Sequence, residues 1–312
     1  MRFAIIGTGG VGGYFGGLLA RDGEDVTFIA RGEHLAAIRE RGLQVESIHG
    51  DFTVRDARAT DRPEEVGPVD AVLFATKTHQ LEAAAEAMKP MIGPRTLIVP
   101  LHNGIDSAER TAAVVGPEHV VGGLCYVGSM IAAPGIIRQN SPFRRVIAGE
   151  LPGSTAAPSG RLQPIVDALA ATGVAAEISD DIQAARWSKF AFIAPFSAVG
   201  AATRVPAGEM RDLPDTRALL HDAIREVVAV ARLSGVNVAA DLAEQTIAFF
   251  DSLPPHMMAS MQRDVLDGRP SELDSMVGVV ARMGRQLGAE TPVFRALYAA
   301  LQPQERRSRA AR

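Results

Sequence analysis

The 312-residue sequence predicts an α/β domain followed by an all-α domain. Apolar strand patterns alternate with helix patterns through the first part of the chain, and from Asp181 onward only helix patterns follow. A glycine-rich turn directly after the first strand pattern supports the same fold class. The change of pattern near Asp180 predicts two domains, 1–179 and 180–312, and a site built from both would lie in the cleft between them.

The glycine-rich turn has the form Gly-x-Gly-x-x-Gly. Gly7 permits a tight turn, Gly9 lets the backbone approach a pyrophosphate, and Gly12 lets a helix lie against the strand. The helix N-terminus adds unpaired N–H groups and a positive dipole end. A glycine-rich turn without a ligand is the alternative, but the strand–turn–helix order favours a Rossmann dinucleotide-binding domain. The residues expected to bind the cofactor here are Gly7, Thr8, Gly9, Gly10, Val11 and Gly12.

The second strand pattern, residues 25–30, ends at Arg31, which lies 19 residues after Gly12. A protein that prefers NAD usually carries Asp or Glu at this place, to bind the ribose 2′-hydroxyl. A guanidinium suits the 2′-phosphate of NADP instead, through charge and paired hydrogen bonds. The alternative is a solvated surface arginine. We favour a role for Arg31 in binding NADP or NADPH.

Two later strand patterns, 70–75 and 96–100, are each followed by a polar loop. The first loop contains Lys77 and the second contains Asn103. Open α/β sheets bind ligands at the carboxyl ends of their strands, so both side chains are placed to reach cofactor or substrate. Capping of a helix or turn is the equally plausible local interpretation.

The remaining patterns complete both domains. A hairpin is expected over residues 43–54, a loop over 152–160, and a frayed, arginine-rich tail over 305–312. Further strands are expected at 120–127, 146–148 and 174–178. Helices are expected at 32–41, 162–172, 182–201, 213–233, 242–252, 260–266 and 273–287.

Composition narrows the functional class. The formal net charge of −4 gives no reason to expect a nucleic-acid partner. Cys125 is the single cysteine, so no internal disulfide is expected, and no Cys/His cluster has metal-ligand spacing. A first strand beginning at Arg2 predicts no signal peptide, and no apolar run is long enough for a membrane span. These features predict a soluble, cytoplasmic protein without a metal.

Lysine is scarce. Of 32 basic residues only Lys77, Lys89 and Lys189 are lysine. A position that stays lysine in so arginine-rich a chain suggests a need for a compact ammonium that can lose its proton.

These motifs, in order and spacing over essentially the whole chain, resemble the ketopantoate reductase (2-dehydropantoate 2-reductase) family. The resemblance implies a Rossmann domain and a helical domain related to that of 6-phosphogluconate dehydrogenase. It also implies NADPH-dependent reduction of a 2-oxo acid, nominally 2-dehydropantoate to pantoate in pantothenate biosynthesis. The residues that carry it are Gly7-x-Gly9-x-x-Gly12, Arg31, Thr76-Lys77-x-x-Gln80, Asn103-Gly104, Trp187-x-Lys189, Ser260-Met261-x-x-Asp264 and Ser271-Glu272-Leu273-Asp274.

The resemblance also implies residue roles. Lys189 matches the catalytic lysine, whose ammonium can stabilise a developing alkoxide and then donate a proton. Ser260 matches a substrate-binding residue, and Glu272 matches an acid that contacts the cofactor near that lysine. Asn103 and Lys77 match residues at the nicotinamide and substrate end. The alternatives are a solvated lysine, a helix N-cap for Ser260 and a dipole partner for Glu272.

The sequence departs from the family at three positions where well-characterised members have asparagine. Ile193 and Ser197 follow Lys189 by four and eight residues on one helix face, and Ala207 is the third. Loss of these amides predicts a less polar 2-oxo acid, another carbonyl or an imine as substrate. Arg204 is a candidate replacement for a lost carboxylate contact.

Two alternatives concern the role and assembly of the chain. A protein that binds NADP without catalysis is the alternative to an enzyme, but retention of Lys189 and Glu272 argues against it. The long apolar helix at 182–201 is compatible with a homodimer.

Overall fold

The computed structural model describes residues 1–153 and 160–310. The chain forms two compact units. The first comprises Met1–His102 and Ser107–Ile182, and the second comprises Asn103–Asp106 and Gln183–Arg312. The loop expected at 152–160 lies largely outside the described residues. Within the described ranges, no helix combines the length and apolar character needed to cross a membrane.

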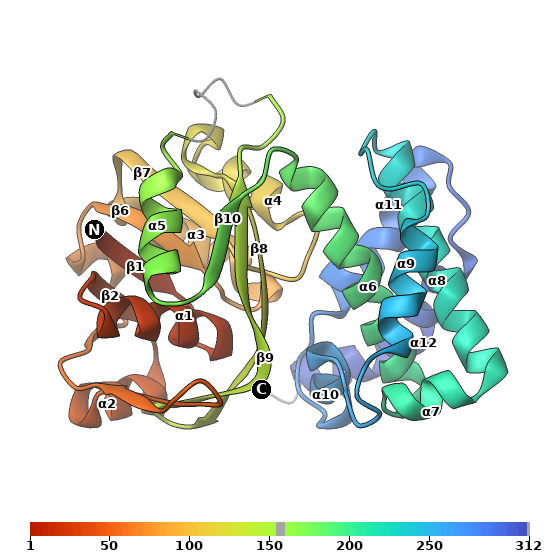
Figure 1. The fold of residues 1–312 in the computed structure, drawn as a ribbon, viewed down its shortest axis with the longest axis horizontal. Coiled ribbons are helices and arrows are strands. Elements are labelled where there is room, and N and C mark those ends of the chain that lie inside the picture. The colour runs from red at the N-terminus through yellow and green to blue at the C-terminus, as the bar shows by residue number, and fades with distance from the viewer. Residues whose placement is uncertain (154–159, 311–312) are drawn as a thin grey trace. The chain divides into compact units, whose positions relative to one another are not determined.

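A five-stranded parallel sheet forms the centre of the first unit (Figure 1). Its central strand β1 pairs with β2 on one side and with β6 on the other, so the strand order reverses beside β1. Such a reversal is where doubly wound sheets bind dinucleotides. In spatial order the strands are β5 (Arg58–Thr60), β2 (Asp25–Ile29), β1 (Arg2–Ile6), β6 (Val69–Phe74) and β7 (Ile92–Pro100).

Alternate residues of β1 enter two separate cores. Phe3 and Ile5 join a cluster with Tyr14 and Phe15 of α1 (Gly10–Arg21). Ala4 and Ile6 join the opposite cluster, to which the helices α3 and α4 contribute. Both faces of the sheet are therefore buried, which explains the nearly continuous apolar strands. The other helices of the unit are α2 (Gly32–Arg41), α3 (Leu81–Met88), α4 (Ser107–Val115) and α5 (Gln163–Ala171), with 3₁₀ turns at Pro63–Glu65, Thr78–Gln80, Lys89–Met91 and Pro117–His119.

A second sheet packs on the far side of α1. The expected hairpin at 43–54 forms, but in this second sheet and not on the parallel one, because Leu43 and Val45 pack into the cluster around α1. Two of its strands are longer than expected and form a twisted ribbon. The strands are β4 (Phe52–Val54), β3 (Leu43–Ser47), β9 (Ile136–Gly149) and β10 (Ala175–Ile178), with β8 (Gly122–Ala133) paired to β9.

The second unit is helical around one apolar core (Figure 1). The expected helix at 273–287 begins as a π-helix, Asp274–Gly278, before it becomes α11. A short helix, α7, was not expected from the sequence. The helices are α6 (Ile182–Thr203), α7 (Ala207–Asp212), α8 (Pro214–Leu233), α9 (Leu242–Asp251), α10 (Ser260–Leu266), α11 (Val279–Leu287) and α12 (Pro292–Ala310).

The expectation of a frayed C-terminal tail is wrong. Helix α12 continues to Ala310, and Leu301, Glu305 and Ser308 are buried along it. The polar, arginine-rich composition hid this packing because the buried face contains charged and hydroxyl side chains that bond to the neighbouring backbone. Residues 311 and 312 lie outside the described part.

Candidate active site

The glycine-rich turn between β1 and α1 combines close packing with one open position. Gly7 has φ +91°, and a Cβ there would lie 2.7 Å from the Thr76 nitrogen. A Cβ on Gly12 would lie 2.3 Å from the Gly7 oxygen, and one on Gly10 2.5 Å from the Ser129 oxygen. A Cβ on Gly9 would meet nothing within 4 Å. Packing accounts for Gly7, Gly10 and Gly12, whereas packing sets no such limit at Gly9.

Thr8 holds the turn in place through two hydrogen bonds to β2. Its hydroxyl donates to the Ile29 oxygen at 2.9 Å, and its backbone N–H reaches the same oxygen at 3.3 Å. Its side chain therefore joins the turn to β2. Val11, in the first turn of α1, packs its half-buried side chain against the core below. The unpaired N–H groups that begin a helix are the donors available to a phosphate here.

Arg31 lies just after β2, next to β1, at the carboxyl-terminal edge of the parallel sheet. It is the N-cap residue of α2, and its side chain is exposed. Within the ranges that the structure describes, its guanidinium has no ion-pair partner. This placement suits a cationic side chain that receives a phosphate from solvent.

The loops after β6 and β7 are joined by His102. Its Nε2 lies 3.2 Å from the Thr76 hydroxyl oxygen, and its ring packs edge-on against Phe74 with centroids 4.6 Å apart. Burial lowers the pKa of His102 to about 3, with a smaller contribution from Arg110, so the ring is neutral. Lys77 follows Thr76 as the N-cap residue of the turn Thr78–Gln80, half-buried in the first unit.

Asn103 and Lys189 form the clearest polar pair in the second unit. The Lys189 Nζ donates to the Asn103 Oδ1 at 2.9 Å, and both side chains are half-buried. Lys189 extends from α6, whereas Asn103 belongs to the short segment Asn103–Asp106 that clusters with the helical unit. A neutral amide oxygen thus accepts one N–H of the ammonium.

Arg186, one turn before Lys189, holds this segment in place and was not singled out from the sequence. It is buried, donates to the Ile105 backbone oxygen, and contacts the Gln183 Oε1 at 3.0 Å. A charged residue three positions from Lys189 on the same helix was the available signal, but arginine is too common in this chain to stand out.

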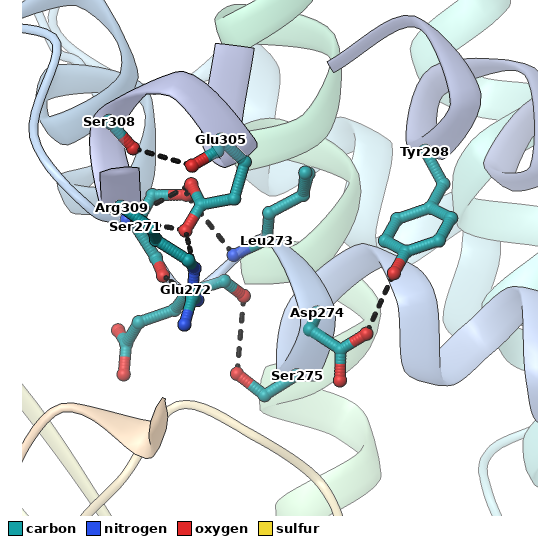
Figure 2. Close-up of polar contacts among 9 residues, drawn as sticks. All are labelled: Ser271, Glu272, Leu273, Asp274, Ser275, Tyr298, Glu305, Ser308 and Arg309. Atoms are coloured by element: carbon teal, nitrogen blue, oxygen red, sulfur yellow. Dashed lines mark hydrogen bonds and ion pairs between the residues drawn. The ribbon is translucent and has the colours of Figure 1, made fainter. Parts of the chain in front are cut away.

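The segment around Glu272 completes the polar cluster of the second unit. Glu272 is buried, and the Ser275 hydroxyl donates to its backbone oxygen at 3.2 Å (Figure 2). A Cβ on Gly104 would lie 3.3 Å from the Ser275 Cβ, so this segment packs directly on the residue after Asn103. The fold therefore gathers Asn103, Lys189 and Glu272 within one unit.

The remaining predicted substrate residues are placed less favourably. Ser260 is half-buried and is the first residue of α10. The N-cap position, which was the alternative role for Ser260, is occupied by Ala259. Ile193 is half-buried against the helical core. Ser197 is fully buried, and in the described structure its hydroxyl has no hydrogen-bond partner. Ala207 is fully buried, at the start of α7.

Arg204 is not brought to Lys189. It follows the last residue of α6, with φ +65° and an exposed side chain. The two residues lie fifteen positions apart along and just past α6, which corresponds to about 22 Å along the axis. Its position therefore does not support the suggested carboxylate contact.

Comparison with known proteins identifies the family. Residues 3–153 match the model described as ketopantoate reductase PanE/ApbA, and residues 181–305 match the model of its C-terminal part. An uncharacterized oxidoreductase of Bacillus subtilis, YkpB, is 32% identical over 307 residues, covering 98% of this chain and 99% of YkpB.

Two solved structures share the fold. A 2-dehydropantoate 2-reductase from Geobacter metallireducens is 31% identical with a TM-score of 0.90, covering 97% of this chain and 99% of that one. The ternary structure of D-mandelate dehydrogenase with NADH and anilino(oxo)acetate has a TM-score of 0.89 at 23% identity, covering 98% and 99%. Both halves of the fold class expected from the sequence are confirmed, and the chain belongs to the ketopantoate reductase PanE/ApbA family.

Proposed function

We propose that this oxidoreductase reduces a 2-oxo acid with NADPH, nominally 2-dehydropantoate to pantoate for pantothenate biosynthesis in the cytoplasm. The observation that carries the proposal is the Lys189–Asn103 pair at 2.9 Å, one turn from a buried arginine and in the same unit as Glu272. The open position at Gly9, before the N-terminus of α1, supports the binding of a dinucleotide.

The chemistry assigns a task to each residue. A bound nicotinamide supplies the hydride that reduces the carbonyl carbon. The Lys189 ammonium donates a hydrogen bond to the carbonyl oxygen, stabilises the negative charge that develops there, and transfers a proton from Nζ to give the hydroxyl. Asn103 keeps the ammonium oriented. Arginine could stabilise this charge but not readily give up the proton, which agrees with lysine at this position.

The identity of the substrate depends on the residues of α6 that follow Lys189 on the same helix face. By the family resemblance, Ile193 and Ser197 stand where well-characterised members have asparagine, and Ser197 is fully buried. A site that loses buried amide donors loses its discrimination for a polar substrate. This observation favours, as the second candidate, reduction of a less polar 2-oxo acid or imine by the same chemistry. A non-catalytic NADP-binding protein remains the third.

The test is NADPH oxidation with ketopantoate beside bulkier apolar 2-oxo acids, in the natural protein and in Lys189→Ala. We expect turnover that falls by about 10²–10⁴-fold in the variant, with NADPH affinity kept, because a positioned proton donor contributes on that scale. Turnover of apolar acids alone favours the second candidate. Equal, background oxidation in both proteins with tight NADPH binding contradicts an enzymatic role.

A further inference from the structure

The C-terminal helix α12 bonds directly to the residue before Glu272. The buried Glu305 accepts the Ser271 backbone N–H at 3.2 and 3.1 Å through its two carboxylate oxygens. The Ser271 hydroxyl donates to the Glu305 Oε2 at 2.6 Å and accepts the Leu273 N–H at 3.2 Å. Both neighbours of Glu272 are therefore held by one carboxylate and one hydroxyl (Figure 2).

Arg309 closes the arrangement one turn later on α12. Its Nε lies 2.7 Å from the Glu305 Oε1, and its Nη2 donates to the Ser271 backbone oxygen at 3.4 Å. A buried carboxylate is tolerated only when it is paired and hydrogen-bonded, and Arg309 supplies the charge. The N–H and C=O of Ser271 are thus both tied to α12.

Helix α12 is itself anchored at its other end. Glu226 of α8, buried in the core, accepts the N–H groups of Val293 and Phe294 at 2.7 and 2.9 Å. These are among the N–H groups that a helix leaves unpaired at its start. The helix is therefore a fixed support from which Glu305 and Arg309 act.

The Glu272 side chain is left outside this set of bonds. Figure 2 shows its carboxylate pointing away from Glu305 and α12, while its backbone oxygen accepts the Ser275 hydroxyl and the Met276 N–H at 3.2 and 3.0 Å. The backbone on both sides of Glu272 is fixed, and its carboxylate is presented elsewhere.

We propose that Glu305 and Arg309 are positioning residues that set the place of Glu272 for catalysis. The inference rests on the proposed function and on the role that the family resemblance implies for Glu272, an acid that contacts the cofactor near the catalytic lysine. Residues that hold a catalytic geometry are expected to affect rate without touching the substrate, because a displacement of about 1 Å can cost about 100-fold.

The experiment is a double-mutant cycle between Arg309→Ala and Glu272→Gln, measured as kcat and KM for NADPH-dependent reduction. Arg309→Ala is expected to lower kcat by about tenfold in the natural background and to have little further effect when Glu272 is already Gln. Arg309→Lys should recover part of the loss, because it restores the charge beside Glu305. The matched control is Arg307→Ala, an exposed arginine on the same helix, and should leave kcat unchanged.

Hydrogen exchange over residues 268–275 provides the readout that is independent of turnover. Exchange should become faster in Arg309→Ala but not in Arg307→Ala, because Glu305, which accepts the Ser271 N–H, loses its charged partner and the Ser271 backbone oxygen loses the Arg309 contact. Additive losses in the cycle would mean that α12 serves stability only, and would overturn the inference. Absence of turnover in the natural protein would instead overturn the proposed function. In that case, unchanged exchange in Arg309→Ala would also contradict the claim that α12 holds Ser271 in place.

Discussion

At the scale of single residues, the feature that bears most on the proposed chemistry is the hydrogen bond from Lys189 to Asn103. The Asn103 oxygen is neutral, so its contact orients the ammonium without neutralising its charge. A carboxylate in the place of this amide would compete with a developing alkoxide for the positive charge. An amide acceptor is therefore consistent with the role proposed for Lys189, which is to stabilise negative charge on the substrate oxygen and then donate a proton.

Arg31 allows a prediction about cofactor choice. Arg31→Ala should weaken NADPH binding by about 10- to 100-fold and leave NADH binding nearly unchanged, because a hydrogen bond to a charged group contributes about 1.5–3 kcal/mol. The measurement is the KM for each cofactor under the same conditions. The exposed Arg55→Ala serves as control for the loss of a positive charge. A parallel rise of both KM values would argue against a 2′-phosphate contact.

The sequence could identify residues whose chemistry is unusual for this chain. Lys189 stood out because lysine is scarce, and Gly7, Gly9 and Gly12 because their spacing after a strand is typical of a dinucleotide-binding turn. Arg186 and Glu305 could not be found in this way. Their importance comes from a backbone oxygen and a backbone N–H that lie far away in the sequence, and only the fold brings these groups together.

At the scale of elements, the glycines at the start of α1 meet two different requirements, close packing and open space. Gly12 faces the Gly7 oxygen, whereas Gly9 faces open space. Gly9 also has an extended backbone, φ −87° and ψ −159°, that alanine adopts readily. The same glycine motif therefore contains one position required by packing and another that packing leaves unexplained.

Alanine at these two positions should have opposite consequences. Gly12→Ala should destabilise the protein by about 1–3 kcal/mol, because its methyl group would overlap the backbone of the turn. Gly9→Ala should cost less than about 1 kcal/mol and weaken cofactor binding at least about tenfold. Urea unfolding and NADPH titration of both variants measure this contrast. Normal NADPH affinity in Gly9→Ala would show that the open space is not the pyrophosphate site.

The bounds of several helices followed from the sequence, whereas the lengths of β8, β9 and α12 and the pairing of the strands did not. Helices at 32–41 and 260–266 were predicted at their observed bounds, because apolar spacing and flanking glycine or turn residues define them locally. The second sheet was not predicted, since β3 pairs with β9 across about ninety residues and local pattern carries no register over such a separation. The buried face of α12 was missed for another reason, because Glu305 and Ser308 are polar and only the fold shows that they are buried.

At the scale of the whole molecule, His102 couples stability to pH. In the folded protein burial lowers its pKa to about 3, and in the unfolded chain it has its ordinary value of 6.5. The unfolded state therefore binds the proton first as pH falls. Stability is fully present above pH 6.5 and decreases between 6.5 and 3.

Unfolding at two pH values tests this coupling. Between pH 7 and pH 5 the contribution of His102 should fall by about 2 kcal/mol, at about 1.4 kcal/mol for each pH unit below its unfolded pKa. The pH dependence of the free energy of unfolding should therefore be smaller by that amount in His102→Gln. The exposed His49→Gln should keep the dependence of the natural protein. Identical dependence in all three proteins would contradict a neutral buried ring.

The assignment of Asn103–Asp106 to the helical unit has a practical consequence for protein engineering. A chimera that exchanges the two units between relatives by cutting once, near residue 182, would take Lys189 and the loop that it contacts from different parents. Asn103, Gly104 and Ile105 would come from one parent, and their partners Lys189, Ser275 and Arg186 from the other. Recombination that keeps these contacts would need to transplant the four-residue segment together with the helices, as one discontinuous block.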